Sequence, residues 1–334
     1  MKLRRVRMEN RYRIEALVKT TWCPLEVLEG LVEFGRERGV DGDLASDMLA
    51  VLQLSPADQS ELLARLGEVD DLSMTATLES ESTVCLPFEP ASFRDFMLYE
   101  QHVINSTRGY VKRFMPGLHK ITSVVERVTG KPFGKFRPKP IWYRQPIYYL
   151  SNHLNFAVSG DDVLWPHYTD ALDYELELGA VIVRPLFNAS PREAQAAVGG
   201  FFVLNDFSAR DVQKDEMESG FGPQKAKHFC STVSATVLSA DQVWPNFDNL
   251  GGSVSINDRE VATCSAAGPQ HSVAEAIAFA SKGEQLHPGE VFATGTLPGG
   301  SGMESGHWLK DGDKLQLAID GIGAVENTVA TVPQ

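Results

Sequence analysis

The segment that most constrains the fold is a run of alternating residues, Leu172-Asp173-Tyr174-Glu175-Leu176-Glu177-Leu178, which continues into Ala180-Val181-Ile182-Val183. Strict alternation is typical of a β-strand, so Asp173, Glu175 and Glu177 are expected to project from one face. The strand then becomes apolar on both faces, as strands that enter a covered core do.

The two glutamates of this strand are candidate metal ligands. Carboxylates two positions apart at the entrance of a core repel each other unless a cation lies between them. The alternative is a solvated strand face, since carboxylates are mostly exposed in proteins. For Glu175 and Glu177 alone the solvated face is the more frequent case, so the choice depends on the rest of the chain.

Composition limits the possible partners. The 334 residues, 43% hydrophobic and 22% charged, suffice for one large domain or a large domain with an appendage. With 31 basic and 44 acidic residues the net charge is −13, which argues against nucleic acid or an anionic membrane as partner. No run approaches ~18 apolar residues, and no apolar signal segment follows the basic start. Four isolated cysteines favour a reduced, cytoplasmic protein.

Residues 1–82 are predicted to form a small, largely helical N-terminal region. Leucines recur at helical spacing between residues 25 and 35, and a second helix is expected between Ser55-Pro56 and Gly67. A polar stretch at 79–82 separates this region from the remainder of the chain. Its two amphipathic helices are expected to cover a surface of the main domain or of its dimer partner.

From residue 83 onward strand signals dominate, in apolar runs bounded by Gly, Pro, Asn and Asp: Ile147–Leu150, Ala180–Val183, Phe201–Leu204, Thr232–Leu238 and Val291–Ala293. The helices expected here are few and short: Phe93 to about Ile104, Pro191–Val198 and Val273–Ser281. The predicted fold class is therefore α+β, mostly β, with a rolled or mixed sheet and not a doubly wound one.

Ser92 is expected to cap the first of these helices, which would place Asp95, Tyr99 and His102 on one helix face. A carboxylate and an imidazole two turns apart can serve different tasks, one holding a cation and the other moving a proton. A buried structural histidine would explain His102 equally well.

Asp206 and Lys227 are further candidates. Asp206 follows a buried strand, and sheets hold ligands in crevices at the carboxyl ends of strands. Alternatively, Asp206 or Ser208 caps the following helix. Lys227 lies between two apolar stretches, where a lysine is usually solvated, but near carboxylates it would neutralise charge or hold an oxyanion.

The glycine-rich loop at residues 295–304 does not have the ending of a P-loop or the spacing of a dinucleotide fingerprint. No Gly-x-Ser-x-Gly elbow occurs in the chain. Nucleotide binding and serine hydrolase chemistry are therefore not expected.

Taken together and in this order, several segments resemble the fumarylacetoacetate hydrolase family. They are Phe93-Arg94-Asp95-Phe96 with Glu100-Gln101-His102, Trp142-Tyr143 to Tyr149, Leu172 to Leu178, Asn205-Asp206-Phe207-Ser208-Ala209-Arg210-Asp211, Lys227-His228-Phe229 and Thr294-Gly295-Thr296. The resemblance covers about residues 83–334, and residues 1–80 do not show it.

The resemblance implies a mixed β-roll catalytic domain over residues 83–334, usually a homodimer, that binds one divalent cation. Carried over by motif, the metal ligands are Asp95, Glu175, Glu177 and Asp206, which as oxygen donors favour Mg²⁺, Ca²⁺ or Mn²⁺. His102 is the implied general base, Glu304 the carboxylate that orients it and Lys227 the oxyanion donor. The implied substrate-binding residues are Met97, Tyr149, Arg210, Gln213, Met217 and Thr296.

The chain departs from the family pattern at three places. Met97 and Met217 stand where fumarylacetoacetase carries tyrosines, so a substrate with an apolar tail is expected instead of fumarylacetoacetate. Asn105 stands where smaller relatives carry a glutamate, which makes Glu304 the candidate partner of His102. The number of residues between Arg210 and Lys227 also differs slightly from the family pattern.

Further basic residues are weaker candidates in this pattern. Lys225 is a second candidate for the oxyanion role, and a carboxylate-binding group could come from Arg108, Lys112 or Arg113.

The reaction implied by the resemblance is hydrolysis of a carbon–carbon bond in a 1,3-diketo acid such as an acylpyruvate. His102 would activate water, and the departing enolate would be stabilised by the cation. The alternative is a decarboxylase, tautomerase or dehydratase of a keto acid at the same site. A binding relative without catalysis is the third possibility.

Overall fold

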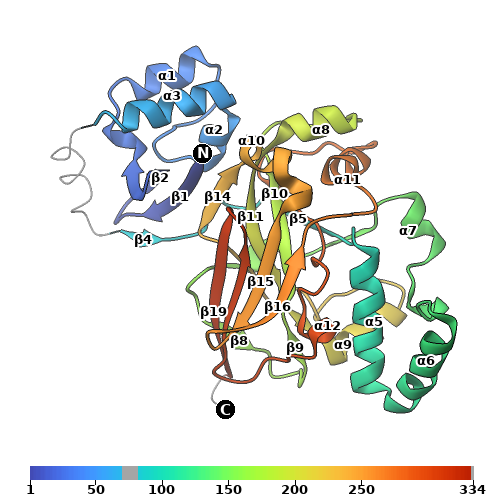
Figure 1. Ribbon diagram of the computed structural model, residues 1–334. Helices are drawn as coiled ribbons and strands as arrows, with labels where there is room; N and C mark the ends of the chain where they lie inside the picture. Colours follow the sequence, from blue (N-terminus) through green and yellow to red (C-terminus); the bar gives the residue numbers. More distant parts are fainter. Residues whose placement is uncertain (70–81, 332–334) are drawn as a thin grey trace.

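The computed structural model describes residues 1–69 and 82–331, and its largest element is a twelve-stranded sheet (Figure 1). Its strands follow the order β3-β2-β1-β14-β11-β10-β17-β5-β6, with β4 beside β1 and β13 joining β11 to β7. Their bounds are β1 Lys2–Arg7, β2 Tyr12–Val18, β3 Thr21–Pro24, β4 Thr83–Val84, β5 Ser92–Phe96, β6 Tyr148–Leu150, β7 Phe156–Val158, β10 Leu176–Ile182, β11 Val198–Asp206, β13 Ser231–Val233, β14 Thr236–Ser239 and β17 Glu290–Ala293.

A second sheet of five strands lies across the middle of the first (Figure 1). Its order is β16-β15-β18-β19-β8, with bounds β16 Arg259–Ser265, β15 Gly251–Ile256, β18 Lys314–Ile319, β19 Gly323–Thr331 and β8 Val163–Trp165. A short pair, β9 Leu172–Asp173 and β12 Ser208–Ala209, lies next to the carboxyl end of β11.

The alternating run of the sequence is buried as expected, but it forms two strands, β9 and β10, instead of one, with Tyr174 and Glu175 between them. Leu176 and Leu178 of β10 belong to one apolar cluster with Leu317 of the five-stranded sheet. Val181 belongs to a second cluster on the other face, together with Leu3 of the N-terminal region. Strand β10 therefore lies between two cores, and any acidic side chain on it is removed from water.

Helices surround these sheets, and several of them contribute side chains to the two cores. Their bounds are α1 Leu31–Glu37, α2 Met48–Gln53, α3 Pro56–Leu66, α5 Glu100–Phe114, α6 Pro116–Thr129, α7 Pro140–Arg144, α8 Pro191–Ala197, α9 Arg210–Glu218, α10 Ala240–Val243, α11 Val273–Ala280 and α12 Gly302–Ser305. No helix among the described residues has the length and apolarity needed to cross a membrane.

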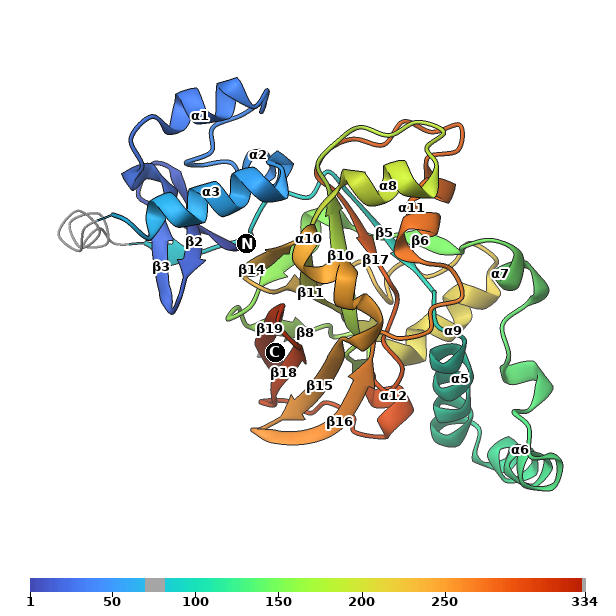
Figure 2. The ribbon, with the colours of Figure 1, turned by 45° about the horizontal axis from the view of Figure 1, so that its top comes forward.

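The N-terminal region contains both strands and helices, so the prediction that it is largely helical is not confirmed. The helix after Ser55-Pro56 is present as α3 and is capped by Ser55 as expected, but strands β1 to β3 precede it (Figure 2). Strand β1 pairs antiparallel with β14, which makes these strands part of the large sheet. Short strands with mixed charged and apolar residues were overlooked because the leucine spacing farther along was stronger. The predicted separator at 79–82 lies almost entirely outside the described residues, and the domain boundary at 82/83 stays a prediction.

The expected helix from Phe93 to about Ile104 was also wrong in its first half. Residues Ser92–Phe96 form strand β5, which pairs parallel with β17 and antiparallel with β6. The hydroxyl of Ser92 donates to Glu290 and caps no helix. Tertiary pairing overrides the local cap signal here, and helix α5 begins only at Glu100.

Most of the remaining fold predictions are confirmed. The fold is a mixed α+β one with more strand than helix, and the helices expected at 191–198 and 273–281 are α8 and α11. The run Thr232–Leu238 is two strands, β13 and β14, instead of one. Helix α6 was not predicted.

The junction between the N-terminal strands and the main sheet yields a first prediction. Leu3 is fully buried and lies opposite Val237 in the β1–β14 pair. Leu3→Ala should lower the free energy of unfolding by roughly 2–5 kcal/mol in a single cooperative transition. Val32→Ala, at an exposed position of α1, is the matched control and should change it by less than about 0.5 kcal/mol. Chemical denaturation measures both values, and a separate early transition that alone responds to Leu3→Ala would show that residues 1–69 unfold independently.

Candidate active site

Three carboxylates from three elements meet at one end of the large sheet. Asp95 comes from β5, Glu177 from β10 and Asp206 from the end of β11. Each offers an oxygen atom, and these oxygens all lie within 4.8 Å of one another. The relative exposures are 4%, 1% and 0%, which rules out the alternative of a solvated strand face.

Two oxygens of this carboxylate cluster are buried without a hydrogen-bond partner among the described residues, Asp95 Oδ1 and Glu177 Oε2. Burial raises the pKa of Asp95, and the nearby Asp206 raises it further. Burial and the proximity of Asp95 likewise raise the pKa of Glu177. Buried carboxylates without compensation are costly, and a hard divalent cation with oxygen ligands would supply the charge that is missing. The donor set therefore fits Mg²⁺, Ca²⁺ or Mn²⁺.

Glu175 lies beside this cluster and is compensated by basic side chains. Its carboxylate accepts from Arg210 Nη2 at 2.7 Å and forms a short ion pair with Lys227 Nζ. Burial alone would raise the pKa of Glu175, but Arg210 and Lys227 hold it well below its usual range. Glu175 thus lies at the edge of the group formed by Asp95, Glu177 and Asp206, paired with two basic side chains.

Lys227 joins Glu175 to the cluster. Its ammonium lies 2.5 Å from Asp206 Oδ2 and is buried. The hydroxyl of Tyr149 donates to the same Asp206 oxygen, and Thr296 Oγ1 lies 3.4 Å from Glu177 Oε1. All three residues belong to the set implied by the family resemblance, and the structure brings them to the carboxylates.

His102 and Glu304 form a pair, although they are far apart in the sequence. The Nδ1 atom of His102 lies 2.8 Å from Glu304 Oε2, and its Nε2 atom lies 3.7 Å from Glu175 Oε1. Glu304 is fixed in turn by the Ser301 hydroxyl and the Gly299 amide, each at 3.1 Å. One ring nitrogen is thereby oriented by Glu304, and the other lies near Glu175, an arrangement that suits a general base.

A close helix–helix approach sets this pair. Helix α5 carries His102 and α12 carries Glu304, and the two lie side by side in both ribbon views (Figures 1 and 2). A Cβ atom on Gly109 would lie 1.8 Å from the carbonyl oxygen of Met303, so only glycine permits this approach. The backbone amide of Met303 donates to Asp173 Oδ2 at 3.1 Å. The backbone of Met303, the residue directly before Glu304, is therefore fixed by Gly109 at its carbonyl and by Asp173 at its amide.

Asp173 is a site residue that was missing from the predicted set. It is fully buried and accepts from Arg210 Nε at 2.8 Å, while Arg210 also donates to Gln213 Oε1 at 2.9 Å. Arg210 thus binds Asp173, Glu175 and Gln213 at once. Asp173 was visible in the alternating pattern as the third carboxylate of one strand face, but nothing in the pattern separated a ligand from a residue that positions one.

A sequence profile described as Fumarylacetoacetate (FAA) hydrolase C-terminal matches residues 124–330. The chain belongs to the fumarylacetoacetate hydrolase family. This confirms the resemblance drawn from the motifs.

Members of this family differ in the reaction that they catalyse. Oxaloacetate tautomerase YisK of Bacillus subtilis is 32% identical over 181 residues, which are 54% of this chain and 58% of the tautomerase. A fumarylacetoacetate hydrolase structure from Exiguobacterium antarcticum superposes with a TM-score of 0.63 at 20% identity, covering 99% of this chain and 100% of that one. The maleylpyruvate hydrolase of Sphingobium sp. SYK-6 gives 0.64 at 17% identity with the same coverages. The two structures show the shared fold.

The remaining candidate residues lie near the surface. Met97 and Met217 are 39% and 49% exposed. Of the weaker candidates, Lys225 is exposed, unlike the buried Lys227. Arg108 is engaged by Glu126 of α6 through two bonds of 3.0 Å, and the guanidinium of Arg113 stacks on the Trp308 ring at 3.7 Å. The alternative that Asp206 or Ser208 caps a helix was wrong, since α9 begins after Ala209 without a side-chain cap.

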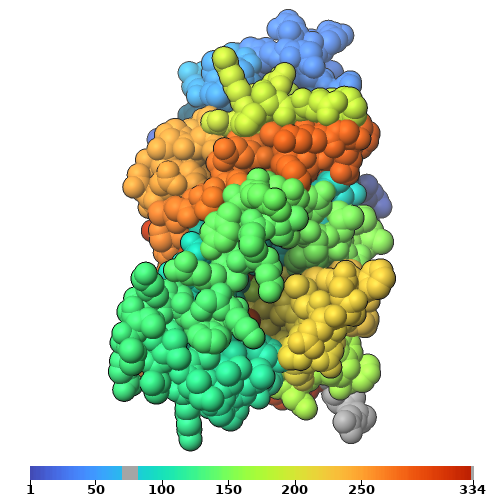
Figure 3. All heavy atoms as spheres, turned by 90° about the vertical axis from the view of Figure 1, so that its right-hand side faces the viewer, coloured from blue at the N-terminus to red at the C-terminus, as the bar shows by residue number. Residues whose placement is uncertain are grey.

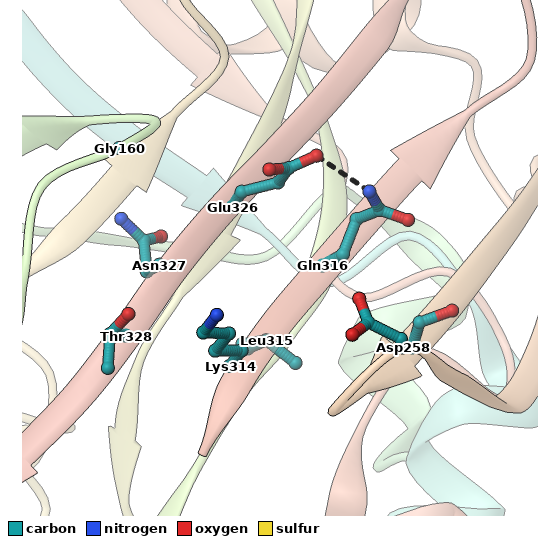
Figure 4. A pocket seen from close by; sticks show the side chains of 9 residues that line it. Gly160, Asp258, Lys314, Leu315, Gln316, Glu326, Asn327 and Thr328 are labelled. Atoms are coloured by element: carbon teal, nitrogen blue, oxygen red, sulfur yellow. Dashed lines mark hydrogen bonds between the residues drawn. The ribbon is translucent and has the colours of Figure 1, made fainter. Parts of the chain in front are cut away.

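The described surface of this fumarylacetoacetate hydrolase family protein has several hollows, of which two are shown in Figures 3 and 4. One opens between the green segment that contains α5 to α7 and the yellow segment around α9 (Figure 3). The other is a groove of about 480 Å³ along β18 and β19, lined by residues such as Lys314, Gln316 and Glu326 (Figure 4). The second groove contains none of the site residues described above.

The Gly109–Met303 contact yields a second prediction. Gly109→Ala should push α5 and α12 apart and lengthen the His102–Glu304 contact, because the new methyl group meets backbone that cannot rotate away. A displacement of about 1 Å at such a pair can lower turnover by about 10²-fold. Gly117→Ala on α6, where a Cβ meets nothing within 4 Å, is the matched control. Turnover is measured for both variants alongside circular dichroism, and unchanged turnover of a folded Gly109→Ala protein would contradict this account of the pair.

Proposed function

We propose that this protein is a metal-dependent enzyme that hydrolyses a carbon–carbon bond in a 1,3-diketo acid of the acylpyruvate class. The observation that supports the proposal is the His102–Glu304 pair, in which the other ring nitrogen of His102 lies 3.7 Å from Glu175 Oε1, beside the buried carboxylate cluster. Asp95, Glu177 and Asp206, with Glu175 beside them, would hold the cation. A divalent cation bound there would polarise the substrate carbonyl and stabilise negative charge on the leaving enolate.

Each remaining step is assigned to a residue of this chain. His102 Nε2 removes a proton from water, and Glu304 stabilises the charged ring at Nδ1. The hydroxide attacks the acyl carbonyl carbon, and Lys227 donates to the oxygen that becomes negative. The bond between the acyl carbon and the methylene carbon then breaks. The proton from His102 goes to the methylene carbon, so the products are a carboxylate and pyruvate.

The substrate tail is assigned to the exposed methionines. Met97 and Met217 provide flexible apolar surface and no hydrogen-bond donor. An alkyl or aryl acylpyruvate gains contact with such side chains, whereas a second carboxylate would lose partners. We therefore infer a substrate with one carboxylate and an apolar tail.

A second candidate function is tautomerisation of a keto acid such as oxaloacetate. It is favoured by the 32% identity to the Bacillus subtilis tautomerase over about half of this chain. In that reaction His102 would move a proton between carbon and oxygen, and no water would attack. Both candidates use the same base, so the fate of water distinguishes them.

The deciding experiment is turnover in ¹⁸O-labelled water with divalent cation present. Acylpyruvate hydrolysis should place one ¹⁸O atom in the carboxylate of the released acid, detected by mass spectrometry together with stoichiometric pyruvate. His102→Ala should lower this turnover by ~10²–10⁴. His287→Ala, at an exposed histidine, is the matched control. Accelerated enol–keto exchange of oxaloacetate without cleavage of any acylpyruvate would refute hydrolysis in favour of the tautomerase.

A further inference from the structure

The backbone directly before Lys227 is held by a single carboxylate, that of Glu216 on α9. Glu216 Oε2 accepts from the amide of Gln224 at 2.6 Å and from that of Ala226 at 3.1 Å, and Oε1 accepts from Lys225 at 2.9 Å. Three successive amides thus converge on one side chain. Nothing in the sequence pattern had singled out Glu216.

The carbonyl groups of the same segment are fixed from other elements. The carbonyl of Ala226 accepts from the amide of Ala209 at 2.8 Å, and that of Lys225 accepts from the hydroxyl of Tyr168 at 2.6 Å. Within the segment, the amide of Lys227 donates to the carbonyl of Gln224 at 3.0 Å. Residues 224–227 therefore form a turn whose amides bind Glu216 and whose carbonyls bind Ala209 and Tyr168.

The chain between α9 and this turn depends on glycine. Gly220 and Gly222 have φ values of 86° and 79°, in the left-handed region that glycine adopts without strain. Glycine-rich connections also leave much conformational freedom in the backbone. The carboxylate of Glu216 accepts hydrogen bonds from three amides and so restricts the backbone directly before Lys227. Hydrogen bonds to an ionised acceptor are stronger than those between neutral groups.

We propose that Glu216 is a positioning residue that directs Lys227 into the carboxylate cluster. Lysine carries its charge on a flexible four-carbon stem, so the placement of its backbone decides where Nζ can reach. Here Nζ contacts both Glu175 and Asp206. The effect of Glu216 on turnover rests on the function proposed above, whereas its effect on the turn and on cation binding does not.

The variants that test this role are Glu216→Gln and Glu216→Ala. Glutamine retains one acceptor but places an NH₂ donor where the second oxygen receives an amide, and alanine removes both acceptors. Glu218→Gln is the matched control, because Glu218 lies on the same helix, is exposed and pairs with Lys214 at 2.7 Å. Glu216→Ala should lower kcat by about 10-fold or more, while Glu218→Gln leaves kcat unchanged.

A double-mutant cycle separates positioning from general structural support. If Glu216 acts through Lys227, adding Glu216→Ala to Lys227→Met should lower kcat by less than about 2-fold beyond Lys227→Met alone. A full additional loss in that background would overturn the proposal.

Two readouts do not require turnover. Hydrogen exchange at the amides of residues 224–226 should become faster in Glu216→Ala, and unchanged exchange there would overturn the proposal. Mn²⁺ affinity, measured by calorimetry, should rise in both Glu216→Ala and Lys227→Met, because the ammonium no longer occupies Glu175 and Asp206. A fall in affinity in Glu216→Ala beside a rise in Lys227→Met would also overturn it. If no substrate is turned over by the wild type, the proposed function fails while these two measurements still decide the role of Glu216.

Discussion

The folded structure depends on compensation of the negative charges of several carboxylates that are buried away from water. Asp95, Asp173, Glu175, Glu177 and Asp206 are all buried within the same part of the molecule. Arg210 and Lys227 form ion pairs with Asp173, Glu175 and Asp206, but Asp95, Asp173 and Glu177 each keep one oxygen without a partner among the described residues. The negative charge that stays unpaired would be compensated by a hard divalent cation, which prefers oxygen ligands.

The fold places these groups through long-range pairing. Strand β17 lies between β5 and β10, which brings Asp95 and Glu177 together from segments about eighty residues apart. The His102–Glu304 pair depends on a short helix, α12, whose residue Met303 contacts both Gly109 and Asp173. Because Asp173 also binds Arg210, the helix that orients the base is tied to the residue that compensates Glu175. A small displacement of α12 would therefore shift both the His102–Glu304 pair and the Arg210 contacts of Glu175.

Sequence reasoning located this site better than it located the elements that carry it. Glu175 and Glu177 follow from the alternation, and Asp206 from its place after an apolar run, because both are local patterns. Asp95 was placed on a helix that turned out to be strand β5, since the pairing that decides its conformation comes from β17, nearly two hundred residues later. Glu304 was found only through the family resemblance. Glu216 acts on backbone amides, whose positions no local pattern reports.

The central claim is that the carboxylate cluster binds one divalent cation, and a crystal soaked in Mn²⁺ tests it most directly. The anomalous difference map should show one dominant peak within roughly 2.0–2.6 Å of oxygens from Asp95, Glu177 and Asp206. The refined electron density of the same crystal should show Lys227 Nζ displaced from at least one of its two carboxylate partners, Glu175 and Asp206. A map at saturating Mn²⁺ with no peak among these residues, or with the dominant peak elsewhere, would contradict the account.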